Sequence, residues 1–370
     1  MIYADHAATT PCLPSAAAAV AKALGAGLGN PGSRQHEPGR QALALLDDAR
    51  AAVAELIHAR SAEVILTSGA TEALNLGILG VATRLLATRP RFVTWAAEHS
   101  AVLEPCQALT QAGAEVAVLG VDRQGRYAPC SADSRTALIS VMLVNNETGV
   151  IQNVAALSAA AHAAGALVCC DATAAIGRMP VDVMTLGADL VACSGHKFYA
   201  PPGTGALWIR RGLAIDPLIH GGGQERGLRS GTPNVPSLAG LAVAARMAQT
   251  ELAERSAHLT EMTAMLEHRL STALPGLVIH GAASVRAPGI SMITLPGLRR
   301  GWLAQLVRVA ASGGSACSEG SHVLAAMGVP AAEATNALRL SLGIGTSSTD
   351  VQAIADEVIS AARRLTGLDR

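Results

Sequence analysis

Short, continuous apolar runs alternate with helical patterns up to about residue 210, and this alternation limits the possible folds more than any other feature of the sequence. Apolar residues recur at helical spacing over 40–58, and a continuous apolar run follows at 64–66. Such runs are typical of strands buried on both faces of a parallel sheet. The runs that predict strands are 64–66, 92–95, 116–119, 138–144, 166–170, 190–193 and 206–209, and helices are predicted between them at 70–86, 101–111 and 154–164. We therefore expect an α/β fold with a mainly parallel, seven-stranded sheet.

The pattern changes after about residue 236. A long helical stretch rich in Ala, Leu, Glu and Arg reaches residue 270, a strand-like run follows at 290–295, and a last helix begins near residue 350. We predict a large α/β domain over 15–250. A smaller α+β domain should comprise 251–370 together with 1–14.

Composition excludes several classes of protein. The 28 basic and 28 acidic side chains balance, 50% of the residues are hydrophobic, and only 15% are charged. A disordered chain would be far more charged. A protein that holds nucleic acid through a bulk positive field would carry an excess of basic residues. Aromatic residues make up 2% of the chain, too few for stacking platforms that bind single strands.

Cysteine usage and the N-terminal residues indicate a cytoplasmic protein. The seven cysteines are odd in number, form no Cys-x-x-Cys pair, and show no zinc-ligand spacing, as expected of reduced thiols. The first six residues contain neither a basic stretch nor an apolar core of a signal peptide. The Ala-rich stretch 155–177 is interrupted by His162 and Asp171, so we expect no membrane span. Because the cysteines lack zinc-ligand spacing, we also expect no metal site.

Lysine is almost absent, and one of the two lysines stands in a distinctive context. Of the 28 basic residues only Lys22 and Lys197 are lysines, and no Gly-Lys-Ser/Thr of a phosphate-binding P-loop exists. Arginine cannot deprotonate to act as an amine nucleophile. Lys197 follows the predicted strand 190–193, where burial can depress its pKa and make it a base or a Schiff-base former. The alternative is a lysine that extends its amine to the surface.

Four polar segments follow predicted strands, where ligands bind in open α/β sheets. These segments are 68–71, 145–147, Asp171 and 194–197. The segment 67–72 joins a strand to a helix and suits a phosphate, although a capped helix start would give the same residues. Asp171 could hold a protonated ring nitrogen, with a helix cap or an ion pair as the alternative. We expect the four segments to converge on one site.

Three further residues are candidates for chemistry. Cys317 lies in a loop of glycines and small polar residues, where an exposed thiol is more reactive than a buried one, unless it is an incidental surface residue. Arg339 has apolar neighbours, and a buried guanidinium needs either a substrate carboxylate or a structural one. His99 follows Glu98 and is either a catalytic or an ordinary hydrogen-bonded histidine.

In their order along the chain, these motifs resemble the cysteine desulfurases of the NifS/IscS type. Those enzymes are class-V aminotransferases that use pyridoxal 5'-phosphate and have the aspartate-aminotransferase-like fold, pyridoxal-phosphate fold type I. The resemblance runs nearly end to end, and the ordered set is more specific than any single motif. The matching segments are 3–11, 29–33, 67–72, 98–99, 144–147, 171–172, 194–197, 221–226, 229–232, 314–317 and 339–343.

The resemblance implies a role for each matching residue. Lys197 would hold the cofactor covalently, Asp171 would pair with its ring nitrogen, and His99 would stack on its ring. Cys317 would accept sulfur from L-cysteine as a persulfide, leaving L-alanine. The phosphate would be bound by Thr71, Ser194 and His196 with Thr232 of a second subunit, and Ala70 would also contact the cofactor. Asn146 would lie near the cofactor and, with Arg339, bind the substrate carboxylate. A homodimer that passes sulfur to an acceptor protein for iron–sulfur assembly or thiolation would follow.

Two positions depart from the family pattern. Ala174 stands where the family usually has a Gln near the ring hydroxyl, and only 318–321 separates Cys317 from His322, fewer residues than usual. The alternatives are other enzymes on the same scaffold, such as a selenocysteine lyase or a small aminotransferase. Cys317 argues against the aminotransferase, and release of alanine would decide that case. A weakly active homologue that acts as an assembly partner in sulfur trafficking is a further alternative.

Overall fold

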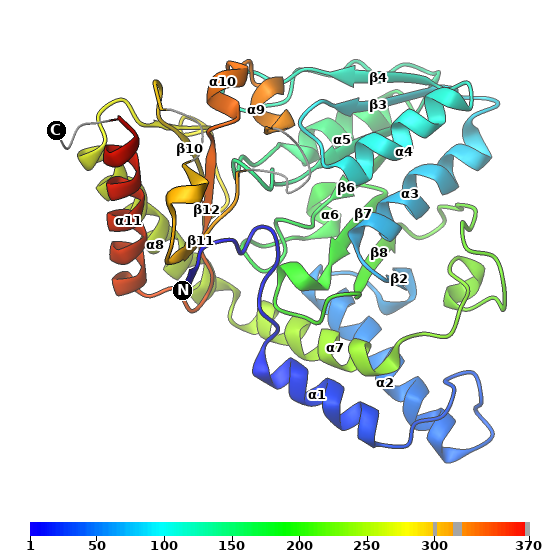
Figure 1. The fold of residues 1–370 in the computed structure, drawn as a ribbon. Coiled ribbons are helices and arrows are strands. Elements are labelled where there is room, and N and C mark those ends of the chain that lie inside the picture. Colours follow the sequence, from blue (N-terminus) through cyan, green and yellow to red (C-terminus); the bar gives the residue numbers. More distant parts are fainter. Residues whose placement is uncertain (299–301, 314–319, 367–370) are drawn as a thin grey trace.

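A computed structural model describes residues 1–298, 302–313 and 320–366 of the chain. The larger part is built around a central sheet covered by helices, and the smaller part lies beside it and contains the last helix (Figure 1). Within the described residues, no helix combines the length and the apolar character needed to cross a bilayer.

The central sheet has seven strands, as the sequence predicts. Their spatial order is β2 (Val64–Thr67), β8 (Gly205–Ile209), β7 (Leu190–Ser194), β6 (Leu167–Asp171), β5 (Thr136–Met142), β3 (Arg91–Trp95) and β4 (Glu115–Leu119). All neighbours pair in parallel except β8, which is antiparallel to both β2 and β7. The connection from β7 to β8, residues 195–204, has no room for the crossover helix that a parallel return requires, so the chain reverses direction.

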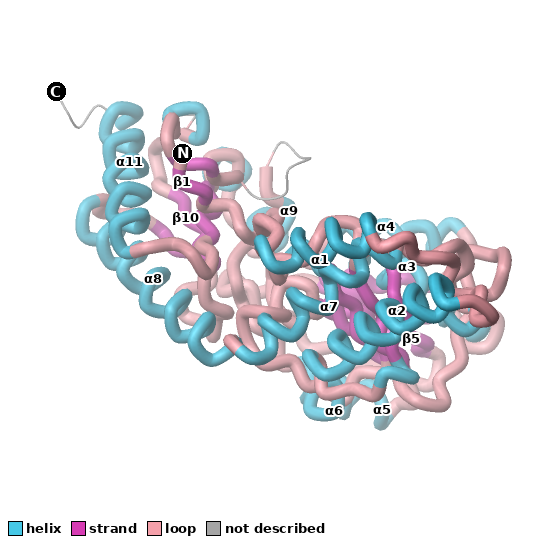
Figure 2. The backbone as a smooth tube through the Cα atoms, turned by 90° about the horizontal axis from the view of Figure 1, so that it is seen from below, coloured by secondary structure: helices cyan, strands magenta, loops and turns pink. Residues whose placement is uncertain are grey.

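Helices cover both faces of this sheet. On one face lie α3 (Ala70–Leu85) and α4 (Ser100–Gln111), and on the other lie α2 (Glu37–Leu56), α5 (Val154–Ala163) and α7 (Val235–Thr250). Within β7, Val191 and Cys193 pack on the second face and Leu190 and Ala192 on the first. Figure 2 shows the sheet between these layers, with α1 (Pro14–Gly25) next to α7. The burial of every β7 side chain explains why its sequence is continuously apolar.

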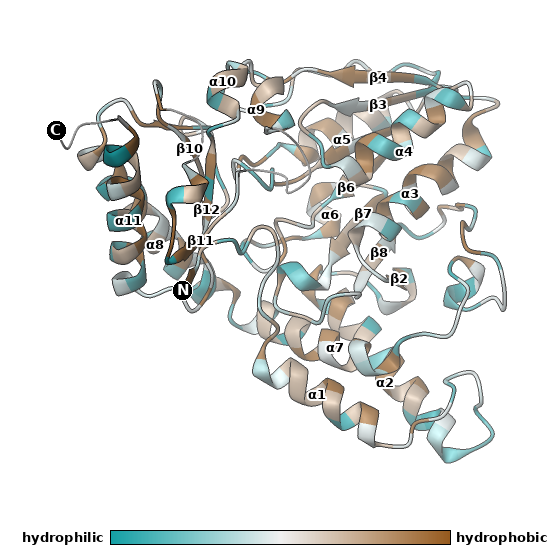
Figure 3. Cartoon of the chain, in the orientation of Figure 1, coloured by the Kyte–Doolittle hydropathy of each residue, from teal (hydrophilic) through white to brown (hydrophobic). Residues whose placement is uncertain are grey.

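The smaller part packs helices against a short antiparallel sheet. Its three strands have the order β12 (Leu338–Ser341), β10 (Ile290–Thr294) and β9 (Val278–Ile279). The helices α8 (Leu252–Ala273) and α11 (Ser348–Thr366) share one hydrophobic core with them. Both hydrophobic and hydrophilic residues mark α11 in Figure 3, as expected of a helix with one buried face.

The N-terminal residues also belong to this smaller part. The strand β1 (Ile2–Tyr3) pairs in parallel with β11 (Val309–Ala310), and Ala4 lies in the same core. After β11 in the chain come the short helices α9 (His322–Ala326) and α10 (Ala331–Ala334). In the larger part, the short helix α6 (Val183–Leu186) precedes β7.

The prediction of one continuous helical stretch from about 236 to 270 is wrong. The structure has two helices, α7 and α8, which meet at Glu251. The break separates packing partners: α7 packs on α1 and α2, whereas α8 packs on α11. We therefore propose domain limits near residues 14 and 250, at the start of α1 and the end of α7.

The core of the smaller part allows a test of its stability. Leu266 of α8 is fully buried in that core, so Leu266→Ala should lower the free energy of unfolding by about 2–5 kcal/mol. Denaturant unfolding followed by hydrogen exchange in α8 and α11 measures the loss. As a control, Leu24→Ala at a 71% exposed position should change it by less than about 0.5 kcal/mol. Equal effects of the two substitutions would contradict this packing.

Candidate active site

A cavity of about 450 Å³ lies at the carboxyl ends of β5, β6 and β7. Parallel strands bring these ends to one edge of the sheet, and the polar segments that follow the strands line the cavity. Of the residues predicted from the sequence, it is lined by Ala70, Thr71, His99, Asn146, Asp171, Ser194, His196 and Lys197. The expected convergence of the four polar segments is therefore present.

The start of α3 gives the cavity an anion-binding end. Gly69 is the N-cap residue and has no side chain to accept bonds from the first-turn N–H groups. A Cβ on Gly205 would lie 2.5 Å from the Cα of Gly69, so glycine at position 205 permits this approach of β8 to the helix start. The N–H groups and dipole of α3, with the Ser194 hydroxyl nearby, fit a phosphate group.

Asp171 presents a buried carboxylate to the cavity. It is the last residue of β6 and is 6% exposed, and its Oδ1 accepts a hydrogen bond of 2.9 Å from the Thr173 N–H. Among the described residues no basic side chain forms a salt bridge with it, although a buried carboxylate needs a positive partner. A protonated ring nitrogen would supply that charge, and Ala174 lines the same cavity.

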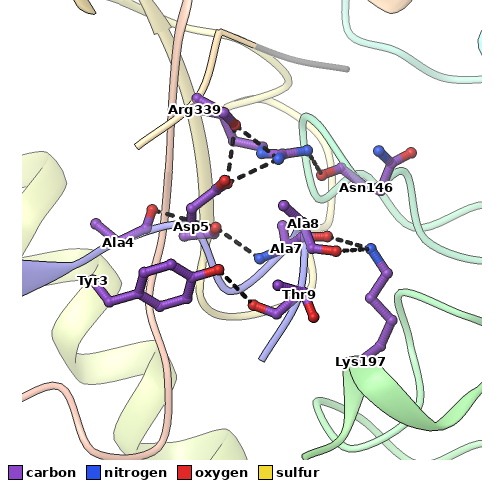
Figure 4. A network of polar contacts seen from close by, with 11 residues as sticks. Tyr3, Ala4, Asp5, Ala7, Ala8, Thr9, Asn146, Lys197 and Arg339 are labelled. Carbon is purple, nitrogen blue, oxygen red and sulfur yellow. Dashed lines mark hydrogen bonds and ion pairs between the residues drawn. The ribbon is translucent and has the colours of Figure 1, made fainter. Parts of the chain in front are cut away.

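Lys197 reaches the cavity from the turn after β7. Its Nζ donates hydrogen bonds to the carbonyl oxygens of Ala7, at 2.5 Å, and Ala8, at 2.9 Å (Figure 4). Burial, followed by the positive charge of Arg339, lowers the pKa of Lys197 to about 8. An amine with this pKa is partly neutral near neutral pH, as a nucleophile or a base requires.

Two histidines flank this amine and stay neutral for the same reason. The Nδ1 of His99 accepts a hydrogen bond from the Ala101 N–H at the start of α4, so the ring proton of neutral His99 is on Nε2. Burial lowers the pKa of His99, and it lowers the pKa of His196 to about 4 together with the charge of Lys197. The Nδ1 of His196 lies 3.0 Å from the Thr9 hydroxyl.

Arg339 lies beside the cavity on β12 and is 2% exposed. Its Nη2 donates to Asp5 at 2.9 Å and to the Ser312 hydroxyl at 2.8 Å, and its Nη1 donates to the Asn146 carbonyl at 3.1 Å. Figure 4 shows Arg339 and Lys197 on opposite sides of the N-terminal segment. The guanidinium thus lies close to Asn146, and these hydrogen bonds all go to groups of the protein itself.

Of the predicted residues that the structure describes, Arg339 and Thr232 do not line this cavity, and Arg339 lies beside it. Thr232 is exposed, and Cys317 lies outside the described residues. The six described cysteines are free thiols. In the described ranges, no three His, Cys, Asp or Glu side chains gather as metal ligands would.

Sequence reasoning missed two contributors to the site. The carbonyls of Ala7 and Ala8 hold Lys197, and a backbone group leaves no signal in residue type. Glu98 is fully buried, and its Oε1 accepts hydrogen bonds from the Tyr127 hydroxyl at 2.6 Å and the Met142 N–H at 2.8 Å. Burial raises the pKa of Glu98 to about 8, so a neutral carboxyl group supports the end of β5 next to His99. In the sequence, only its position directly before His99 could have indicated that Glu98 belongs near the site.

Comparison with known proteins agrees with this geometry. The aminotransferase class-V family model matches residues 2–354. A cysteine desulfurase of Frankia sp. (strain EuIK1) is 40% identical over 395 aligned residues that cover 100% of this chain and 93% of the relative.

Solved structures have the same fold. A NifS-like protein superposes with a TM-score of 0.91 at 33% identity and covers 97% of this chain and 98% of its own. The structure described as SspA in complex with cysteine has a TM-score of 0.82 at 28% identity and covers 93% of this chain and 99% of its own. With the cavity, the uncapped start of α3 and the near-complete coverage, the chain belongs to the cysteine desulfurases of the class-V aminotransferase family.

Proposed function

We propose that this protein is a pyridoxal-phosphate-dependent cysteine desulfurase that converts L-cysteine to L-alanine and captures the sulfur as a persulfide on Cys317. The observation that carries the proposal is the convergence of Lys197, Asp171 and the start of α3 on one cavity of about 450 Å³. An amine, a buried carboxylate and an anion site at three walls of one cavity match the aldehyde, the ring nitrogen and the phosphate of this cofactor.

The residues that would hold the cofactor act at its separate groups. When bound, pyridoxal 5'-phosphate supplies an aldehyde for amines and an electron-withdrawing ring. Asp171 would keep a proton on the ring nitrogen, and His99, whose Nδ1 accepts from the Ala101 N–H, would pack over the ring. The phosphate would be bound by the start of α3 at Ala70 and Thr71 and by Ser194 and His196, all of which line the cavity.

The substrate groups have matching partners. Arg339 and Asn146 bind the carboxylate of L-cysteine, and the Lys197 amine removes the α-proton and returns one when alanine forms. The Cys317 thiolate forms an S–S bond with the substrate sulfur while the substrate C–S bond breaks. The persulfide then passes to an acceptor protein that serves iron–sulfur assembly or thiolation.

The proposal includes a cytoplasmic homodimer. Thr232 is exposed in the single chain, on the loop that resembles the part of the family that completes the neighbouring subunit's phosphate site. Two such loops, exchanged between subunits, would place both cavities at the interface.

Replacing Lys197 tests the assignment of the cofactor amine. Lys197→Ala should lose the visible absorption that the bound cofactor gives and reduce alanine formation by about 10³-fold or more. Absorbance spectroscopy and an alanine assay with L-cysteine measure both effects. Lys22→Ala is the matched control, because Lys22 is the only other lysine and is exposed. Full absorbance of the Lys197 variant would disprove the assignment.

The lowered pKa of Lys197 can be measured directly, because the chain has only two lysines. Trace labelling of the cofactor-free protein with acetic anhydride, read by mass spectrometry, should give Lys197 a titration midpoint at a pH of about 8, with Lys22 as the internal reference. Arg339→Gln should raise the pKa of Lys197, because a neighbouring positive charge that disfavours the ammonium is removed. An unchanged or lower midpoint would refute this coupling.

Cys317 is tested by following the sulfur. Cys317→Ser should keep the cofactor absorption and reduce persulfide formation to background, because the hydroxyl is not an equivalent nucleophile. Mass spectrometry after L-cysteine should place one extra sulfur on Cys317 in the unmodified protein. Cys130→Ser should behave like the parent, and sulfur found on Cys130 or Cys106 would contradict the proposal.

A further inference from the structure

Asp5 already forms an ion pair with Arg339, the arginine proposed to bind the substrate carboxylate. Its Oδ1 accepts a hydrogen bond from Nη2 of Arg339 at 2.9 Å and another from the Ser312 hydroxyl at 2.9 Å. The Ser312 hydroxyl in turn accepts from the same Nη2 at 2.8 Å. Asp5, Ser312 and Arg339 therefore form a closed triangle of hydrogen bonds, joined to Asn146 through Nη1 of Arg339.

The guanidinium is too enclosed to accept a second carboxylate as it stands. The Arg339 side chain is 3% exposed, and its Nε is buried without a hydrogen-bond partner. A substrate carboxylate must therefore displace one of the present acceptors. Asn146 contributes a backbone carbonyl and Ser312 an uncharged hydroxyl, whereas Asp5 is a carboxylate like that of the substrate and its side chain is 19% exposed.

The turn that contains Asp5 also holds the second group that an amino acid engages. The Ala8 N–H donates to the Asp5 carbonyl at 3.0 Å, and the carbonyls of Ala7 and Ala8 accept from Lys197. Figure 4 shows this turn between Arg339 and Lys197. One short segment thus touches both the arginine that would bind the substrate carboxylate and the lysine that the substrate amine would replace.

We propose that Asp5 is an internal competitor of the substrate carboxylate, which pairs with Arg339 in the substrate-free enzyme and gives way to the α-carboxylate of the amino acid. This inference rests on the proposed role of Arg339. An amine without a carboxylate cannot replace Asp5 by an equivalent charge and leaves the internal pair in place. The exchange of one ion pair for another weakens the binding of every α-amino acid, so removal of the Asp5 charge should strengthen it.

Binding of the product separates this role from a purely structural one. Calorimetry on the holoenzyme with L-alanine should show a dissociation constant about tenfold lower in Asp5→Asn, since the charge on one hydrogen bond to a guanidinium is worth a factor of that order. The KM for L-cysteine should fall in parallel. L-Alaninamide, which lacks the carboxylate, should bind both proteins equally. Weaker L-alanine binding in Asp5→Asn would overturn the proposal, because Asp5 would then only orient Arg339.

Further variants serve as controls. Asp5→Glu keeps the charge and should keep the parental preference for L-alanine over L-alaninamide, and Ser312→Ala, which removes no charge, should not reproduce the gain. Asp5→Ser is a second neutral variant if Asn disturbs the turn, which thermal unfolding reveals. If Arg339→Ala leaves L-alanine binding unchanged, the proposed carboxylate site itself fails. If Arg339→Ala weakens binding and the neutral Asp5 variants do not strengthen it, only the inference on Asp5 fails.

Discussion

Parallel pairing of β5, β6 and β7 is the constraint on which the rest of the site depends. Their register places Met142 opposite Asp171, and Asp171 opposite Ala192, so that the three strands end at one edge. The segments that follow them then have to leave the sheet side by side. Asn146, Asp171 and Lys197, which are far apart along the chain, meet at one cavity for this reason. The helices on both faces supply the burial that keeps the strands in place.

Burial at this edge also sets the protonation of the site. Lys197, His99 and His196 each lose part of their hydration, and this burial lowers the pKa of all three groups. The same desolvation raises the pKa of Glu98. One physical cause, burial, therefore lowers the pKa of the nitrogen bases at the cavity and raises the pKa of the carboxyl group beside it.

The N-terminal segment connects the two parts of the molecule. It begins as β1 in the smaller part, passes Arg339 and Lys197, and is joined to the larger part where the Thr10 hydroxyl donates to the His196 carbonyl at 2.9 Å. The Thr10 hydroxyl also accepts from the Tyr199 N–H at 2.8 Å. A shift of the smaller part relative to the sheet would therefore move this segment and change its hydrogen bonds to Lys197. The site is composite, because neither part holds both Arg339 and Lys197.

The sequence alone determined the seven strands of the central sheet and the polar segments that meet at the cavity. Continuous apolar runs predicted the seven strands, the scarcity of lysine singled out Lys197, and the end of an apolar run singled out Asp171. Tertiary structure alone decided the antiparallel course of β8, the break between α7 and α8, and the pairing of Asp5 with Arg339 across 334 residues. The physical reason is that local patterns record which side of an element is buried. The partner that a buried charge meets is chosen only when distant segments pack together, and no periodicity in the chain encodes that choice.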